Sequence, residues 1–142
     1  MFHGTHTALI TPFKNGEVDK EAFKALIERQ VEAGIDGIVP CGTTGESPTL
    51  TKTEHLKVIE LAVKYAAGRT KVIAGTGANA TAEAIYLTKE AADLGADATL
   101  QVCPYYNKPS QEGLYQHYKT IAAATELPMM LYSIPGLSLI HI

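Results

Sequence analysis

The sequence has little of what marks proteins of membranes, of the cell exterior and of nucleic-acid complexes. It holds only two cysteines in 142 residues, and no apolar run approaches the length of a membrane span. Its first residues, 1–4, do not open a secretory leader. The formal net charge is −3, so the chain also lacks the basic excess that attracts nucleic acid or an anionic membrane. We therefore expect a cytoplasmic protein with neither of these partners.

The two cysteines, Cys41 and Cys103, lack the spacing of a metal site. Each stands at the end of a predicted strand, and one further predicted strand separates them along the chain. In a sequential parallel sheet, two strand spacings place them roughly 10 Å apart, whereas a disulfide requires Cα atoms within about 7 Å. We therefore predict two buried thiols. His3 and His6 have no third ligand nearby, so we predict neither a metal nor a cofactor.

Apolar strands and amphipathic helices alternate along the chain at intervals of roughly 30 residues, the length of one βα unit. With 46% hydrophobic residues the chain can build the core of one domain. Asp19 and the pair Thr51 and Glu54 are typical helix-capping residues. The pattern predicts a parallel sheet with right-handed crossovers, made of four helices and of five strands at residues 5–10, 37–41, 71–75, 98–103 and 129–132.

A loop bracketed by glycines, Gly42 and Gly45, follows the second predicted strand. Glycine lets the backbone turn tightly and approach a ligand, and free amides in such a turn can face a carboxylate or a phosphate. Thr43 and Thr44, between the glycines, offer hydroxyls for hydrogen bonding or proton relay. The loop is consistent with an anion site, and also with an ordinary glycine-rich connection between a strand and a helix.

Further distinctive side chains follow the carboxyl ends of the later strands, namely Asn79, Tyr105, Tyr106 and Tyr132. Both (β/α)8 barrels and open doubly wound sheets bind ligands at this end. No Gly-x-Gly-x-x-Gly run follows the first strand, which argues against a dinucleotide site. A complete barrel needs about 250 residues. The fold class that we expect from these residues is α/β with a parallel sheet; if the sheet belongs to a parallel (β/α)8 TIM barrel, the chain is about its first half.

Four segments of the chain carry a more specific pattern. They read GTTGES at residues 42–47, AGTGANA at 74–80, PYYNKPSQEGLY at 104–115 and LYSIP at 131–135. In this order they resemble the 4-hydroxy-tetrahydrodipicolinate synthase (dihydrodipicolinate synthase) family. The resemblance implies that residues 1–136 form the N-terminal half of a barrel, with residues 137–142 as a tail that departs from the family pattern.

The resemblance also implies a reaction. The family condenses pyruvate with aspartate-4-semialdehyde through a Schiff base on a lysine, in lysine (diaminopimelate) biosynthesis, and is usually a homotetramer. By position, Thr44 and its neighbouring amides would hold the pyruvate carboxylate. Thr43, Tyr106 and Tyr132 would form a proton relay, with Tyr106 supplied across a subunit interface. Tyrosine suits this role because its hydroxyl is a positionable acid and base.

A regulatory lysine site of the family maps onto the chain in part. Its positions correspond to Ser47, Pro48, His55, Asn79, Glu83 and Tyr105. From its place early in a helix, we expect the side chain of His55 to be exposed.

Two departures from the family pattern predict that the chain is a truncated enzyme, inactive alone. Leu137 stands where the family has the arginine that binds the semialdehyde, and the Schiff-base lysine belongs to a sixth strand. Neither Lys71, at the wrong end of a strand, nor Lys108, in a loop, has the burial that such a lysine needs. Without further strands, we also expect the inner faces of Leu9, Val39, Ile73 and Leu100 to be exposed.

Other assignments stay open at this point. The chain could be a fragment of a related pyruvate-dependent lyase, such as N-acetylneuraminate lyase or a keto-deoxy-sugar-acid aldolase. The run at residues 107–113 favours the synthase. It could also be a half barrel that binds a ligand without catalysis.

Overall fold

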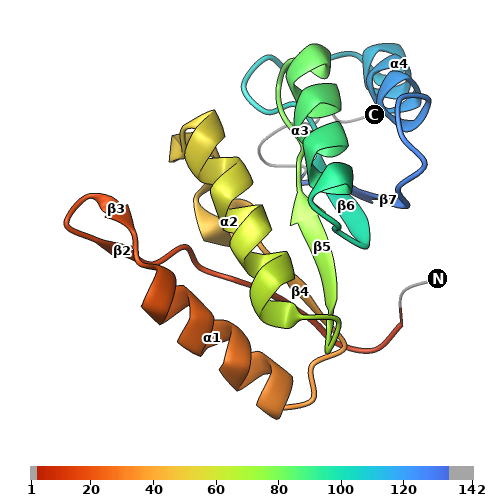
Figure 1. Ribbon diagram of the computed structural model, residues 1–142. Coiled ribbons are helices and arrows are strands. Elements are labelled where there is room, and N and C mark those ends of the chain that lie inside the picture. The colour runs from red at the N-terminus through yellow and green to blue at the C-terminus, as the bar shows by residue number, and fades with distance from the viewer. Residues whose placement is uncertain (1–2, 135–142) are drawn as a thin grey trace.

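The computed structural model describes residues 3–134 (Figure 1). A five-stranded parallel sheet has the order β1-β4-β5-β6-β7. Its strands therefore lie side by side in the order in which they occur along the chain. The predicted strands are confirmed, at β1 His6–Ala8, β4 Gly37–Val39, β5 Lys71–Gly75, β6 Ala98–Val102 and β7 Met129–Tyr132. The predicted tail, residues 137–142, lies outside the described residues.

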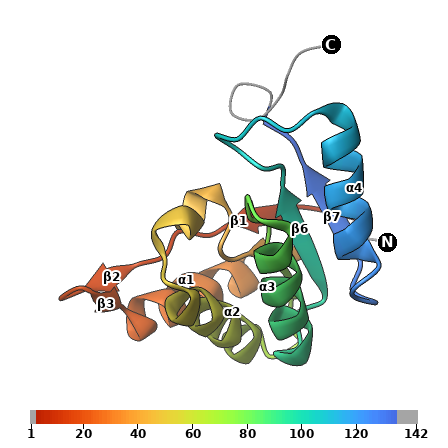
Figure 2. The ribbon, with the colours of Figure 1, turned by 90° about the horizontal axis from the view of Figure 1, so that it is seen from above.

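The four predicted helices are confirmed at α1 Lys20–Glu32, α2 Lys52–Ala66, α3 Thr81–Asp93 and α4 Gln111–Ala122. All four lie on the same side of the curved sheet (Figures 1 and 2). A doubly wound sheet has helices on both faces, whereas a barrel has them only outside. The arrangement is therefore that of a partial (β/α) barrel. None of the helices within residues 3–134 is long and apolar enough to cross a membrane.

The helix starts follow the predicted caps. The Asp19 carboxylate accepts a hydrogen bond from the Ala22 amide at 3.0 Å. Thr51 and Glu54 form the reciprocal capping box, because each side chain bonds the backbone amide of the other residue. These local bonds satisfy amides that have no partner within the helix.

Four short elements were not predicted. A two-stranded hairpin, β2 Phe13–Lys14 and β3 Glu17–Val18, projects from the body of the domain (Figure 2). Two 3-10 turns, η1 Thr43–Gly45 and η2 Ser47–Thr49, lie between β4 and α2. Each element is only two or three residues long, too short to show a periodic apolar pattern.

The main core lies between the sheet and the helices. Phe23 and Ile27 of α1 and Ile38 of β4 are fully buried there. The expected exposure of the inner face is wrong at three positions, because Leu9, Val39 and Ile73 are 2%, 9% and 1% exposed. Val39 and Ile73 pack with their neighbours on β6, Ala98 and Leu100.

Exposed apolar side chains occur instead on β7, where Met130 and Leu131 are 38% and 56% exposed. They alternate between the two faces of a strand at the edge of the sheet. Apolar surface is therefore left uncovered at this edge of the domain.

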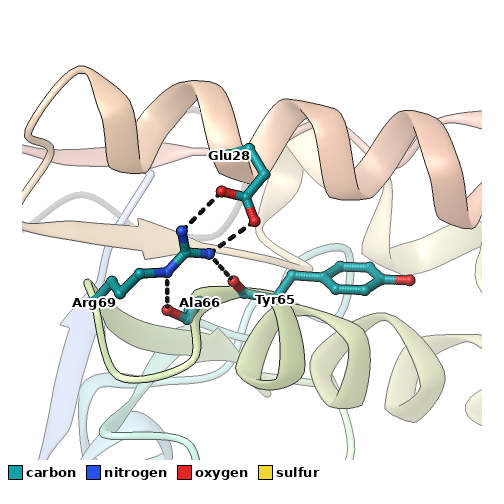
Figure 3. Close-up of polar contacts among 4 residues, drawn as sticks. All are labelled: Glu28, Tyr65, Ala66 and Arg69. Carbon is teal, nitrogen blue, oxygen red and sulfur yellow. Dashed lines mark hydrogen bonds and ion pairs between the residues drawn. The ribbon is translucent and has the colours of Figure 1, made fainter.

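One ionic contact joins α1 to the turn that follows α2 (Figure 3). The guanidinium of Arg69 donates two hydrogen bonds of 2.8 Å to the carboxylate of Glu28 on α1. It also donates to the carbonyls of Tyr65 and Ala66 at the end of α2, at 2.6 and 3.2 Å. The hydrogen bonds from Arg69 hold the pKa of Glu28 below its ordinary value. The two-pronged geometry fixes where the end of α2 meets α1.

Candidate functional site

The loops that follow the strands gather at the carboxyl-terminal end of the sheet and are tied together by hydrogen bonds. The buried hydroxyl of Thr11 donates to the carbonyl of Gly45 at 2.7 Å, which joins the end of the first strand to the glycine-bracketed loop. The Tyr105 amide donates to Asn79 Oδ1 at 2.8 Å, which joins the loops after β6 and β5. The polar residues predicted to act together therefore share one end of the domain.

A cavity of about 90 Å³ opens among these loops, and we call it the inner cavity. It contains two members of the predicted relay, Thr43 after β4 and Tyr132 at the end of β7. The rest of its lining is Cys41, Gly42, Ser47, Pro48, Gly75, Gly77, Leu100, Val102, Tyr105 and Ile134, so two further hydroxyls, of Ser47 and Tyr105, belong to residues of this lining. A small hollow that combines apolar groups with a few hydroxyls suits a small organic molecule.

The other two predicted site residues lie outside this lining. Thr44 is exposed on η1, next to Thr43. Tyr106 is 92% exposed and has a left-handed backbone, with φ of 71°. Its side chain thus projects from the surface, and it can meet a ligand only in another subunit or after a rearrangement.

The glycine-bracketed loop uses part of its backbone for its own fold. The amides of Gly45 and Glu46 donate to the carbonyls of Gly42 and Thr43 at 3.0 Å. Thr43 and Thr44 stand at the start of this turn, where an amide has no acceptor within the turn. The amides at the start of the turn are therefore those that suit the predicted anion site.

A second cavity of about 140 Å³, the outer cavity, lies beside the first. It brings together all six residues of the predicted regulatory set. Its lining is Ser47, Pro48, Leu50, Lys52, His55, Gly77, Ala78, Asn79, Glu83, Leu87 and Tyr105. Four of these residues also line the inner cavity, namely Ser47, Pro48, Gly77 and Tyr105. The two cavities therefore share a wall.

Charge in the outer cavity comes from Glu83 of α3 and Lys52 of α2. The Lys52 ammonium lies 3.4 Å from the Glu83 carboxylate and 6.0 Å from the ring centre of Tyr86. The ion pair is solvent-accessible, so water screens it. Lys52 was not among the predicted site residues.

His55 is buried, and the expectation of an exposed side chain is wrong. Only 5% of the residue is exposed, and Nε2 donates to the carbonyl of Gly75 at 2.7 Å. Because a carbonyl only accepts, this contact places a proton on Nε2. Burial lowers the pKa of His55 below its ordinary value of 6.5, against the smaller opposing effects of the Gly75 bond and the charge of Glu83. The neutral ring thus links the outer cavity to the end of β5.

This burial predicts a pH-dependent stability. The unfolded chain takes up a proton at His55 near pH 6.5, whereas the folded chain does so only at lower pH. The contribution of His55 is therefore complete above pH 6.5 and is lost as the pH falls below it. We expect the free energy of unfolding in urea to fall between about pH 7 and pH 5. The loss should be smaller in His55→Gln, and an equal loss in both proteins would contradict the assignment.

No lysine is among the residues that line the inner cavity within residues 3–134. Lys71 begins β5 at the opposite end of the sheet, where its ammonium lies 2.6 Å from Asp97 Oδ1. Both cysteines are buried, as predicted, and burial raises the pKa of the Cys41 thiol. No group of three His, Cys, Asp or Glu side chains in the described part of the chain could hold a metal ion.

Two glycines of the inner cavity were missed from the sequence. A Cβ atom on Gly75 would lie 2.1 Å from the carbonyl oxygen of Cys41, and one on Gly77 would lie 2.4 Å from the amide nitrogen of Val102. Both positions therefore require glycine, because backbone atoms cannot give way. A Gly-x-Gly directly after a predicted strand was the available signal for this close approach.

A partial barrel with hydroxyl-bearing side chains at the carboxyl ends of its strands has the architecture of the (β/α)8-barrel class, whose sites lie at this end. Comparison with known proteins identifies the family. The sequence profile of the dihydrodipicolinate synthetase family matches residues 1–142, and the chain belongs to that family.

The relatives show how much of the family fold the chain represents. The 4-hydroxy-tetrahydrodipicolinate synthase of Desulfotalea psychrophila is 60% identical over 99% of this chain and 48% of its own length. A solved dihydrodipicolinate synthase from Acinetobacter baumannii, complexed with pyruvate, is 55% identical, with a TM-score of 0.92 over 95% of this chain and 47% of its own. The enzyme from Cyanidioschyzon merolae, solved with lysine bound, is 49% identical, with a TM-score of 0.93 over 96% of this chain and 47% of its own. The chain spans about half the length of these relatives.

Proposed function

We propose that the chain supplies the first half of a cytoplasmic lyase that condenses pyruvate with aspartate-4-semialdehyde in lysine biosynthesis, and that alone it does not catalyse this reaction. The lysine that forms the Schiff base would come from the second half of the barrel. The observation that carries the proposal is the inner cavity, whose lining among residues 3–134 holds Thr43 and Tyr132 but no lysine.

The proposed roles follow from where the hydroxyls lie. Thr43 and Tyr132 face the same small hollow, so a proton could pass between them and a bound substrate. Thr44 and the amides at the start of η1 would hold the pyruvate carboxylate. The pyruvate complex of the Acinetobacter baumannii enzyme, which shares this fold, supports pyruvate as the ligand of the complete site.

Tyr106 would complete the relay of a second subunit. Its almost full exposure and left-handed backbone suit a side chain presented to a neighbour. The assembly proposed for the complete protein is a homotetramer.

The outer cavity would bind lysine as a feedback regulator. It gathers Glu83, which attracts an ammonium group, with Asn79 and Tyr105, which offer polar contacts. The lysine-bound enzyme of Cyanidioschyzon merolae supports this choice of ligand. The Lys52 ammonium already lies beside Glu83, so it would compete with the ammonium group of the bound lysine for this carboxylate.

A trapping experiment tests the proposal. The chain alone is incubated with pyruvate and borohydride, which reduces an imine to a stable adduct, and is then weighed by mass spectrometry. The same treatment is applied to a chimera that joins residues 1–134 to the remaining segment of the Desulfotalea psychrophila relative. We expect no adduct on the chain and a single pyruvyl adduct on the chimera.

The other outcomes are equally informative. A stable adduct on one lysine of the chain alone would contradict its proposed inactivity. A folded chimera that forms no adduct, and condenses no semialdehyde, would favour a half barrel that binds without catalysis.

A further inference from the structure

A polar cluster lies buried next to residues that line the inner cavity. The Gln101 side-chain nitrogen is 2.7 Å from Thr76 Oγ1 and 2.8 Å from Oγ1 of both Thr88 and Thr99. The hydroxyls of Thr76 and Thr88 are 2.9 Å apart. All four side chains are at most 1% exposed. We call these residues the Gln101 cluster.

The cluster is unusual because its amide cannot be fully satisfied. An amide nitrogen has two hydrogens for the three hydroxyl oxygens around it, and Gln101 Oε1 has no hydrogen-bond partner among the described residues. Exchanging the positions of the amide oxygen and nitrogen would place the oxygen among three hydroxyls that can donate. The nitrogen would then take the present position of Oε1, where it would have no partner within residues 3–134. A buried polar atom without a partner lowers stability, so the cluster stabilises the fold less than a fully paired set of side chains would.

The position of the cluster suggests what it does. Gln101 lies between Leu100 and Val102, and Thr76 lies between Gly75 and Gly77; these four neighbours line the inner cavity. Because successive side chains of a strand point to opposite faces, the cluster sits on the outer side of the cavity wall. Thr88 belongs to α3, whose residues Glu83 and Leu87 line the outer cavity.

We propose that the Gln101 cluster is a positioning device that fixes the end of β5 against β6 and α3, and thereby couples the two cavities. A ligand in the outer cavity contacts α3 and the loop after β5. Because the cluster ties these elements together, a displacement of α3 or of the loop after β5 would also move Gly75 and Gly77. These residues line the inner cavity with backbone atoms alone, so the shape of the cavity would change with them. The coupling rests on the proposed function, whereas the positioning itself does not.

Amide hydrogen exchange of the 142-residue chain tests the positioning without any ligand. The amide of Thr76 donates to the Leu100 carbonyl at 3.1 Å, and the amide of Leu9, far from the cluster, donates to the Val39 carbonyl at 3.0 Å. In Gln101→Met, we expect exchange at Thr76 to accelerate about tenfold or more relative to Leu9. Equal acceleration at both amides, or none at Thr76, would overturn the proposal.

Two further variants make the result decisive. Thr88→Val removes one hydroxyl at nearly constant volume and should produce a smaller effect at Thr76; it decides the question if Gln101→Met does not fold. Thr7→Val is the matched control. It breaks another strand-to-helix bond between threonine and glutamine, from Thr7 Oγ1 to Gln30 Oε1 at 2.9 Å, and should leave Thr76 unchanged.

Titration with L-lysine, followed by backbone NMR shifts, tests the coupling. In the unaltered chain we expect shifts at Asn79 of the outer cavity and at Val102 of the inner cavity. Gln101→Met should keep the first and lose most of the second. Persistence of both shifts would refute the coupling. Absence of any shift in the unaltered chain would refute lysine binding at the proposed regulatory site, and hydrogen exchange then decides the positioning alone.

Discussion

Removing the Tyr132 hydroxyl with Tyr132→Phe is expected to lower kcat of the Desulfotalea psychrophila chimera by roughly 10²–10⁴-fold, the range of a positioned acid and base. Thr43→Val should cause a loss of the same order, because Thr43 faces the same cavity. Each change removes one hydroxyl and leaves the apolar part of the side chain, so the thermal midpoint should change little. Steady-state kinetics and thermal unfolding measure the two effects.

Tyr115→Phe is the matched control for the relay. Tyr115 lies on α4, is 56% exposed and has its ring 5.4 Å from the Lys119 ammonium, outside the inner cavity. Its kcat should equal that of the unaltered chimera. If Tyr132→Phe and Thr43→Val both keep the full kcat, the relay assignment does not hold for this chain.

The second large effect concerns the backbone. Gly75→Ala is expected to destabilise the chain by at least about 4 kcal/mol, a large part of an ordinary stability of about 5–15 kcal/mol. The new methyl group would lie 2.1 Å from the carbonyl oxygen of Cys41, and both partners are held in the sheet region. Urea unfolding, or loss of soluble protein, measures the effect.

Gly42→Ala provides the comparison. Gly42 has φ of −77°, and a Cβ there would meet only Val39 Cγ1, at 3.8 Å. We therefore expect its free energy of unfolding to stay within about 1 kcal/mol of the original. Similar stabilities for the two variants would show that the end of β5 can shift and that the inner cavity is less rigid than described.

Most of the fold could be predicted from the sequence because its signals are local. The strand at residues 71–75 and the caps at Asp19 and Thr51 each depend on a few neighbouring residues, and all are confirmed. The topology followed from alternation, since consecutive parallel strands are joined by right-handed crossovers. The alternation alone left a barrel and a doubly wound sheet open; the family resemblance predicted the barrel, and the structure confirms it by placing all four helices on one side.

The site was predicted less completely, because a cavity depends on contacts between distant segments. The family resemblance supplied Thr43 and Tyr132, which the structure brings into one hollow. Helical periodicity could not reveal that His55 meets the carbonyl of Gly75, 20 positions away. Nor could it reveal that Gln101, a polar residue in a strand, finds three hydroxyls from two other segments and its own strand.

The order of the sheet has a consequence for how the chain folds during synthesis. In the sheet that the structure describes, each strand after β1 pairs with the strand that precedes it, so each of these strands has one partner from an earlier part of the chain. Ribosomes deliver the N-terminal segments first, so an earlier strand is already present when each later strand emerges. We expect the sheet to grow one βα unit at a time as the polypeptide emerges. In a longer family member, β7 would then be the growing edge onto which the next unit adds.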